Sequence, residues 1–276
     1  MRHPRLLLIV LSLILFSAFV PSPALKAEDQ PGKYKNVIFF LGDGMQLAHE
    51  ISASRYLFGT DYGLSFQNLP YKTYCTTWDV NTYNIHAAAE GKPPYTENGF
   101  DPRIGYDISK GGDKPYPLHE PDREYMLRYF CGVPVATDSA SAATAFSSGT
   151  KTYSGTISMY NGRRTTTIAQ LLRDQLGYPI GVCSTVPFTH ASPAAFVSHN
   201  IYRGNYWFIA KEILYRTKPD YVVGAGHPIF NKKGLEFISQ EDFLWLKSNQ
   251  QEYYVAMRNT GSKPDLVASA IKAAIL

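Results

Sequence analysis

The sequence is poor in cysteine and in net charge, and both shortages exclude classes of protein. Only three cysteines occur in 276 residues, too few for a scaffold that disulfides hold together. Residues 1–27 contain three of the 27 basic residues and no acidic residue, so 24 basic and 23 acidic residues follow, a formal charge of +1. A nearly neutral chain gives no electrostatic reason to expect nucleic acid or an anionic membrane surface as a partner.

Long hydrophobic runs are also lacking. The longest covers residues 6–20, whereas a transmembrane helix needs about 20 apolar residues. Two arginines precede this run, and the small residues of "PSPALKA" follow it. The pattern predicts a signal peptide over residues 1–27, cleaved after Ala24 or Ala27. We therefore expect export to the periplasm or the extracellular space, without stable insertion in a membrane.

From residue 36 onwards, short apolar runs alternate with helical patterns, and no internal repeat is present. The segments predicted as strands are 36–41, 71–78, 178–186 and 220–226. The segments predicted as helices are 47–58, 166–177 and a helix with Ser192 as its cap and Pro193 at its first position. This alternation indicates a three-layer α/β sandwich, in which helices cover both faces of a mostly parallel central sheet. We predict that residues 28–276 belong to a single domain.

Residues 79–130 interrupt the alternation. They are rich in Asp, Gly, Pro, Asn and Tyr, and they show no sustained period. We expect a long surface excursion from the domain, and loops of this length usually carry function or bind a partner.

The cysteines allow more than one arrangement. If residues 71–78 and the segment that begins at Cys131 are neighbouring strands, a Cys75–Cys131 disulfide would close a loop of roughly 57 residues, worth about 4 kcal/mol. The alternative is two unpaired thiols. Cys183 lies within a predicted strand and is expected to be a small buried hydrophobic residue.

Several polar residues follow predicted strands, where parallel α/β sheets bind their ligands. Asp43 lies between two glycines after the first strand, although a simple Gly-Asp-Gly turn explains it equally well. Ser139 opens a helix whose first N–H groups favour an anion, although Thr137 or Asp138 would serve as an ordinary N-cap. Taken one at a time, these residues do not indicate a function.

The same holds for three residues after the strand at 178–186. His190 and Ser192 are equally compatible with a polar turn, and Arg203 with an exposed cation. As a functional residue, Arg203 would offer a bidentate fork to phosphate or carboxylate. The glycine pattern of "VGAGHP" lacks the third glycine of a dinucleotide fingerprint, which argues against a nicotinamide cofactor.

The combination of motifs resembles the alkaline phosphatases. Four blocks occur in the family's order between residues 36 and 230: "NVIFFLGDGM", "VATDSASAATAFSSGTKTYSGTISM", "VCSTVPFTHASPAAFVSH" with "YRGNYW", and "DYVVGAGHPIF". The resemblance implies hydrolysis of phosphate monoesters through a phosphoserine intermediate, with two zinc ions, one magnesium ion and a homodimeric assembly.

Carried over by this resemblance, Ser139 would be the nucleophile and a zinc ligand, and Asp43 would bridge a zinc and the magnesium. Ser192 would be a magnesium ligand, and Arg203 would bind two phosphate oxygens. Such metal ions would activate a hydroxyl that is otherwise a weak nucleophile, and would stabilise the attacking and leaving oxygens.

Two further residues have less defined roles in the resemblance. His190 occupies a position where some bacterial members have aspartate and animal members have histidine, so it would either ligate the magnesium or lie behind its ligands. Asp138 would orient Arg203 or the serine loop rather than hold a metal.

The resemblance also calls for ligands that the sequence lacks. In the family, a further glutamate, two aspartates and three histidines lie beyond the "GAG" strand, whereas His227 is the only histidine after Gly226. We therefore interpret the chain as the N-terminal portion of an alkaline phosphatase, truncated or partial, with little or no phosphatase activity alone. The alternatives are a related metallo-phosphodiesterase or sulfatase and a non-catalytic fragment that binds phosphate or metal. The Ser-Ala pair and Arg203 favour monoesters.

Overall fold

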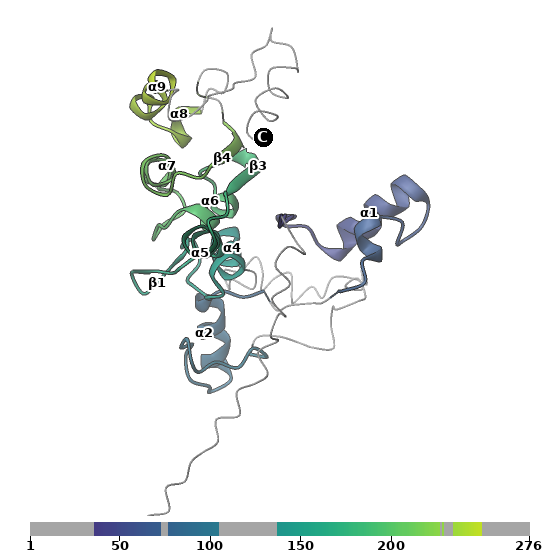
Figure 1. Cartoon of the computed structure of the whole chain (residues 1–276). Coiled ribbons are helices and arrows are strands. Elements are labelled where there is room, and N and C mark those ends of the chain that lie inside the picture. Colours follow the sequence, from purple (N-terminus) through teal and green to yellow (C-terminus); the bar gives the residue numbers. More distant parts are fainter. Residues whose placement is uncertain (1–35, 73–76, 105–136, 227, 229–233, 250–276) are drawn as a thin grey trace, which may run out of the picture. The chain divides into compact units, whose positions relative to one another are not determined.

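The computed structural model describes residues 36–72, 77–104, 137–226, 228 and 234–249 (Figure 1). The chain divides into two units, residues 1–41 and residues 42–276. The predicted signal peptide, Cys75 and Cys131 lie outside the described residues, and so do residues 73–76 of the strand predicted at 71–78.

Residues 36–41, the described part of the first unit, form neither helix nor strand. Val37 is 79% exposed and Phe40 is 87% exposed. The prediction of a buried strand at 36–41 is therefore wrong for this structure. A strand is stabilised by backbone hydrogen bonds to a neighbour, and no such pairing of residues 36–41 is present in the described part of the chain.

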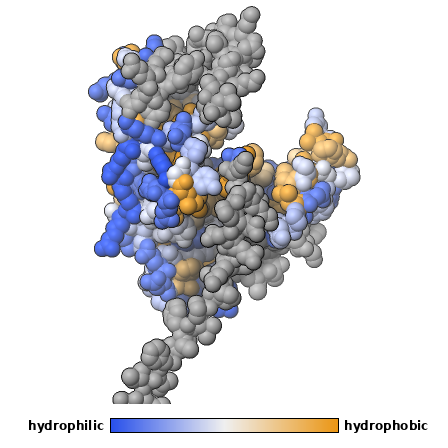
Figure 2. All heavy atoms as spheres, in the orientation of Figure 1, coloured by the Kyte–Doolittle hydropathy of each residue, from blue (hydrophilic) through white to orange (hydrophobic). Residues whose placement is uncertain are grey.

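The second unit begins with a helix that the sequence predicts at the correct residues. Helix α1 (Leu47–Phe58) opens where Gln46 N donates to Nδ1 of His49, and it ends at Gly59, whose φ of 70° suits glycine. Exposed apolar side chains gather at its C-terminal end, and Figure 2 shows this apolar surface over α1. A short 3₁₀ helix, η1 (Ser65–Asn68), follows.

The excursion predicted from residue 79 contains a helix that the sequence pattern did not reveal. Helix α2 (Val80–Ala89) is capped by Asp79, whose carboxylate accepts from Thr82 N at 2.8 Å. Buried apolar residues form a small core around it: Trp78, Val80, Tyr83, Ala87, Tyr95 and Ile104. The part of the predicted excursion at 79–104 therefore contains a helix with a small core, rather than irregular chain throughout.

Two small sheets give the second unit a mixed α/β character. Strands β3 (Gly181–Pro187) and β4 (Tyr221–Ala225) pair in parallel, as their apolar runs predict, with Val182 opposite Val222. Strands β1 (Met159–Tyr160) and β2 (Arg163–Arg164) form an antiparallel hairpin. Among the described residues, each sheet has two strands.

The β3–β4 pair corrects one further expectation. Cys183 is exposed rather than buried, because the two-stranded sheet leaves much of β3 uncovered in the described part of the chain. Glycine is required in the neighbouring strand, since a Cβ on Gly224 would lie 2.5 Å from Phe188 N.

Alanines form the contact between α4 (Ser139–Ser148) and α6 (Ala191–Val197). Five of them are at most 1% exposed: Ala140, Ala143, Ala191, Ala194 and Ala195. Because alanine side chains are single methyl groups, the two backbones can approach closely while the interface stays filled. This packing explains the small-residue sequence of α4.

The remaining helices lie between α4 and α6, or after α6, in the sequence. Helix α5 (Ile168–Leu176) matches its predicted position, with Thr167 as N-cap and Gly177 as C-cap at φ 67°. The other helices are α7 (Tyr206–Lys211), the π-helix η2 (Glu212–Thr217), α8 (Gly234–Phe237) and α9 (Gln240–Ser248). No helix in the described ranges is long and apolar enough to cross a membrane.

Candidate active site

Three predicted site residues meet through one carboxylate. Ser139 Oγ donates a hydrogen bond to Asp43 Oδ1 at 3.0 Å, and Ser192 Oγ donates to Asp43 Oδ2 at 2.6 Å. The two serines are 96 and 149 positions from Asp43 in the sequence. Both oxygens of the Asp43 carboxylate are therefore engaged by hydroxyl groups from different helices.

Asp138, and not Ser139, caps helix α4. Oδ1 of Asp138 accepts from Ser141 N at 3.0 Å and from Ser141 Oγ at 2.7 Å. Burial raises the pKa of Asp138, but these hydrogen bonds and the one from Arg203 outweigh burial and hold the pKa below its usual range. Because the Asp138 carboxylate accepts the hydrogen bond of the N–H group at the start of α4, the Ser139 hydroxyl is available to donate to Asp43.

Helix α6 begins two residues earlier than the sequence predicts. Its N-cap residue is His190 rather than Ser192, and Pro193 occupies the third helical position rather than the first. Proline is still tolerated there, because the N–H groups of a first helical turn have no partner within the helix. With Ser192 inside the first turn, its hydroxyl bonds to Asp43 instead of capping the helix.

His190 is held by aromatic rings. Its ring is stacked on Tyr206, with centroids 5.3 Å apart and an interplanar angle of 12°, and it lies 5.2 Å from the ring of Phe237. Burial and the charge of Arg203 lower the pKa of His190, which outweighs the opposite effect of Glu236 and Asp43. Nε2 of this ring is buried and has no hydrogen-bond partner among the described residues. The histidine is thus disposed to be neutral, with a buried ring nitrogen that no described residue binds.

Arg203 makes an ion pair with Asp138, the residue before Ser139. Its Nη1 donates to Asp138 Oδ2 at 2.9 Å, and its backbone N donates to the carbonyl of Gly155 at 2.7 Å. The Arg203 side chain is 34% exposed. An arginine has five N–H donors, so this ion pair leaves donors that can bind an anion beside Ser139.

The donor set favours one hard cation and is incomplete for zinc. The carboxylate and two hydroxyls around Asp43 are oxygen ligands of the kind that Mg²⁺ accepts, with water completing its shell. Zinc sites normally take three or four protein ligands. No group of three His, Cys, Asp or Glu side chains that could hold a metal is present in the part of the chain that the structure describes.

Sequence reasoning identified Asp43, Ser139, His190, Ser192 and Arg203 as candidates. The structure joins Asp43, Ser139 and Ser192 by hydrogen bonds, whereas Arg203 bonds to Asp138, the residue before Ser139, and His190 packs on aromatic rings. Sequence reasoning did not identify Tyr206 and Phe237, which pack against His190. The signal was weak, since aromatic residues on short helices look like ordinary core residues.

Comparison with known proteins gives consistent matches. The family model described as "Alkaline phosphatase" matches residues 120–223. The chain is 28% identical over 253 residues to Alkaline phosphatase 3 of Bacillus subtilis (strain 168), covering 87% of this chain and 44% of that protein. It is 36% identical over 103 residues to Alkaline phosphatase 4 of the same organism, covering 35% of this chain and 22% of that protein. The chain thus spans less than half the length of either relative.

A solved structure of a histidine-to-aspartate variant of alkaline phosphatase from the Antarctic bacterium TAB5, with magnesium bound in its M3 site, is 31% identical. The match covers 49% of this chain and 36% of that chain, with a TM-score of 0.38.

Proposed function

The chain belongs to the alkaline phosphatase family, and on this premise we propose that it takes part in the metal-dependent hydrolysis of phosphate monoesters through a phosphoserine at Ser139. The observation that carries the proposal is the Asp43 carboxylate, which accepts hydrogen bonds from Ser139 at 3.0 Å and Ser192 at 2.6 Å. An ordinary Gly-Asp-Gly turn or helix cap would not require these three residues to meet.

Asp43 positions the nucleophile and receives its proton. Oδ1 of Asp43 lies within hydrogen-bond reach of Ser139 Oγ, which is the distance a general base needs. Attack forms the bond from Ser139 Oγ to phosphorus and breaks the bond from phosphorus to the leaving oxygen, which takes a proton from water as it departs, while the hydroxyl proton passes to Asp43. Water then attacks the phosphorus of the phosphoserine, breaks its bond to Ser139 Oγ, and releases phosphate, and the serine oxygen regains a proton.

Positive charge and N–H groups near Ser139 bind the phosphoryl group. The first turn of α4 provides N–H groups and the positive end of the helix dipole. Arg203, oriented by its ion pair with Asp138, offers further N–H donors to the phosphoryl oxygens. Because phosphoryl transfer depends mainly on positioning and charge neutralisation, these groups serve the reaction directly.

We include metal ions in the proposal because the alkaline phosphatases typically bind zinc and magnesium. Asp43 and Ser192 would hold a magnesium ion, with His190 beside it, and Asp43 and Ser139 would contribute to zinc. Such ions supply positive charge to the phosphoryl oxygens and lower the pKa of a bound hydroxyl. The described residues alone fit the magnesium better than the two zinc ions, because they include no complete set of zinc ligands.

The proposal extends to architecture and location. We propose that β3 and β4 belong to a larger, mostly parallel sheet in a three-layer sandwich. We also propose export to the periplasm or the extracellular space, and a homodimeric assembly, as the family resemblance implies.

A comparison of ester classes tests the proposal. The chain is supplied with zinc and magnesium and assayed with an aryl phosphate monoester, a bis-aryl phosphate diester and an aryl sulfate. We expect the monoester to be hydrolysed fastest, at a low absolute rate, and this hydrolysis to disappear in Ser139→Ala but not in the exposed-loop variant Ser154→Ala. Preference for the diester or the sulfate would favour a related metallo-hydrolase. Calorimetric binding of phosphate without any turnover would favour a non-catalytic binding role.

A further inference from the structure

The loop that carries Arg203 is anchored at several points. Residues 198–205 connect α6 to α7, and in this loop Asn200 exchanges backbone hydrogen bonds with Ile157 at 2.8 and 2.9 Å. The backbone N of Arg203 donates to the carbonyl of Gly155 at 2.7 Å. These contacts fix where the loop begins to turn towards Ser139.

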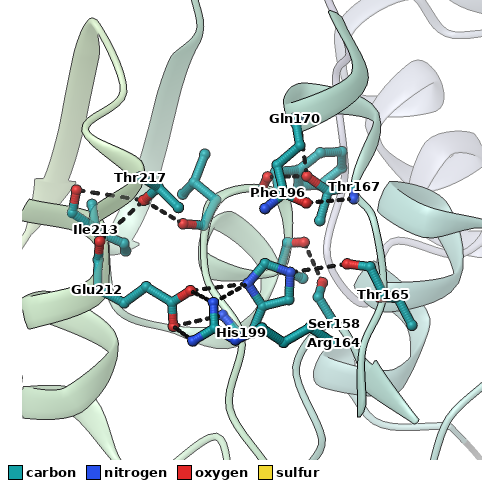
Figure 3. A network of polar contacts seen from close by, with 12 residues as sticks. Ser158, Arg164, Thr165, Thr167, Gln170, Phe196, His199, Glu212, Ile213 and Thr217 are labelled. Carbon is teal, nitrogen blue, oxygen red and sulfur yellow. Dashed lines mark hydrogen bonds and ion pairs between the residues drawn. The ribbon is translucent and has the colours of Figure 1, made fainter. Parts of the chain in front are cut away.

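The most buried anchor of this loop is His199, whose side chain is 1% exposed. Nδ1 lies 3.0 Å from Glu212 Oε1, and Nε2 lies 2.9 Å from the carbonyl oxygen of Thr165 (Figure 3). A carbonyl oxygen accepts and cannot donate, and an ionised carboxylate likewise only accepts. Nε2 therefore donates to the carbonyl of Thr165, and Nδ1 faces both Glu212 Oε1 and, at 3.5 Å, Arg164 Nη1.

Charged groups surround the ring of His199. Arg164 pairs with Glu212 through Nη1 at 2.6 Å and Nη2 at 3.3 Å, so the carboxylate is shared between two cations. Glu212 is the first residue of the π-helix η2, and its side chain is 9% exposed. Lys211 and Arg216 line the same open cavity of about 620 Å³ beside the ring. Glu212 is the only acidic residue among the lining residues, so it is the anion beside the ring.

We infer that His199 is a positioning residue for Arg203: its ring, held between Thr165 and Glu212, fixes the loop so that the Arg203 guanidinium meets Asp138 beside Ser139. This inference rests on the proposed function, because it assigns Arg203 a phosphate to bind.

Nearby hydroxyls provide a control that separates the loop from the helix before it. The carbonyls at the C-terminal end of α6 accept hydrogen bonds from Ser158, Thr167 and Thr217 (Figure 3). Thr217 Oγ1 reaches the carbonyl of Val197 at 2.7 Å. Thr217→Val removes the hydrogen bond to the carbonyl of Val197 at the end of α6 and leaves the hydrogen bonds of the His199 ring in place.

The hydrogen bond from the ring can be measured directly by ¹⁵N nuclear magnetic resonance of the full chain. We expect Nε2 of His199 to carry a proton, because the carbonyl oxygen of Thr165 that faces it can only accept. A ring with no proton on Nε2 would overturn the inference, and this measurement does not depend on any variant folding.

Amide hydrogen exchange tests the positioning. We expect the protection factor of the Arg203 amide to fall at least tenfold in His199→Leu and less than threefold in Thr217→Val.

Each outcome of the exchange experiment decides the inference. Equal loss of protection in His199→Leu and Thr217→Val, or full protection in His199→Leu, would overturn it. None of these readouts requires turnover. If the exchange results hold and Ser139 accepts no phosphate, the anchoring stands and the proposed function fails.

Discussion

Asp43→Asn is expected to lower the rate of phosphoryl transfer to Ser139 by at least about a hundredfold, since general bases contribute about 10²- to 10⁴-fold. The Asp43 carboxylate accepts from both Ser139 and Ser192. Asparagine keeps the shape of the side chain but has no negative charge, and it offers one oxygen acceptor instead of two. The rate is measured in a single turnover, with the protein in excess over an aryl phosphate monoester and with zinc and magnesium present.

The matched control is Asp61→Asn in the same unit. Asp61 makes an exposed ion pair with Arg55, and such pairs contribute about 0–1 kcal/mol to stability. We expect this variant to transfer phosphate at the unaltered rate. If Asp43→Asn stayed within a few-fold of that rate, Asp43 would not be the residue that prepares Ser139.

The second large effect concerns stability. Glu212→Ala is expected to lower the free energy of unfolding by about 3 kcal/mol at pH 7, the lower end of the range for breaking a buried ion pair. The substitution leaves His199, whose side chain is 1% exposed, without its counter-ion, and it also removes the partner of Arg164. Urea unfolding followed by circular dichroism measures the change.

The pH dependence of this effect follows from the pKa of Glu212. Burial raises that pKa, but the hydrogen bond and charge of His199, together with Arg164, outweigh burial and lower it overall. Because the pKa is lower in the folded state than in the unfolded state, the stabilisation is present above the unfolded pKa and is lost as pH falls through the folded value. The difference between the unaltered chain and Glu212→Ala should therefore shrink in acid.

Glu241→Ala is the control for Glu212→Ala. Glu241 is an exposed residue in the first turn of α9, where a negative charge is worth about 0.3–1 kcal/mol. A loss in Glu212→Ala no larger than in this control, or a loss independent of pH, would mean that the buried network does not stabilise the fold.

The sequence predicted helices correctly where capping residues next to the helix determine its ends. Helix α5 has a threonine cap at Thr167 and a glycine stop at Gly177 in the sequence itself, and the structure uses both. Helix α1 ends at Gly59 in the same way. The parallel pairing of β3 with β4 also follows from continuous apolar runs, because strands joined through helices pair in parallel.

The errors arose where contacts distant in sequence decide the outcome. Helix α2 buries Thr82 beside Tyr83, so its buried positions do not follow an apolar period. At the start of α6 a serine followed by proline looks like a cap, but the hydrogen bond from Ser192 to Asp43 spans 149 positions and determines its role instead. The exposure of Cys183 depends on how many strands flank β3, and residue order within β3 does not show this.

For the candidate site, sequence patterns identified the residues but not their partners. Asp43, Ser139 and Ser192 each had an ordinary explanation when considered alone, and the motifs shared with the alkaline phosphatases connected them. The ion pair between Asp138 and Arg203 and the aromatic stacking on His190 depend on side-chain geometry. The spacing of residues in the chain does not contain that geometry.

Locating the transferred phosphate is the most direct measurement. The chain is incubated with a labelled aryl phosphate monoester, zinc and magnesium, quenched in acid, digested, and sequenced by mass spectrometry. We predict phosphoserine at residue 139, its absence in Ser139→Ala, and its strong reduction in Asp43→Asn. Phosphate on a different side chain, or none on this serine under conditions where the monoester is consumed, would contradict a nucleophile prepared by Asp43.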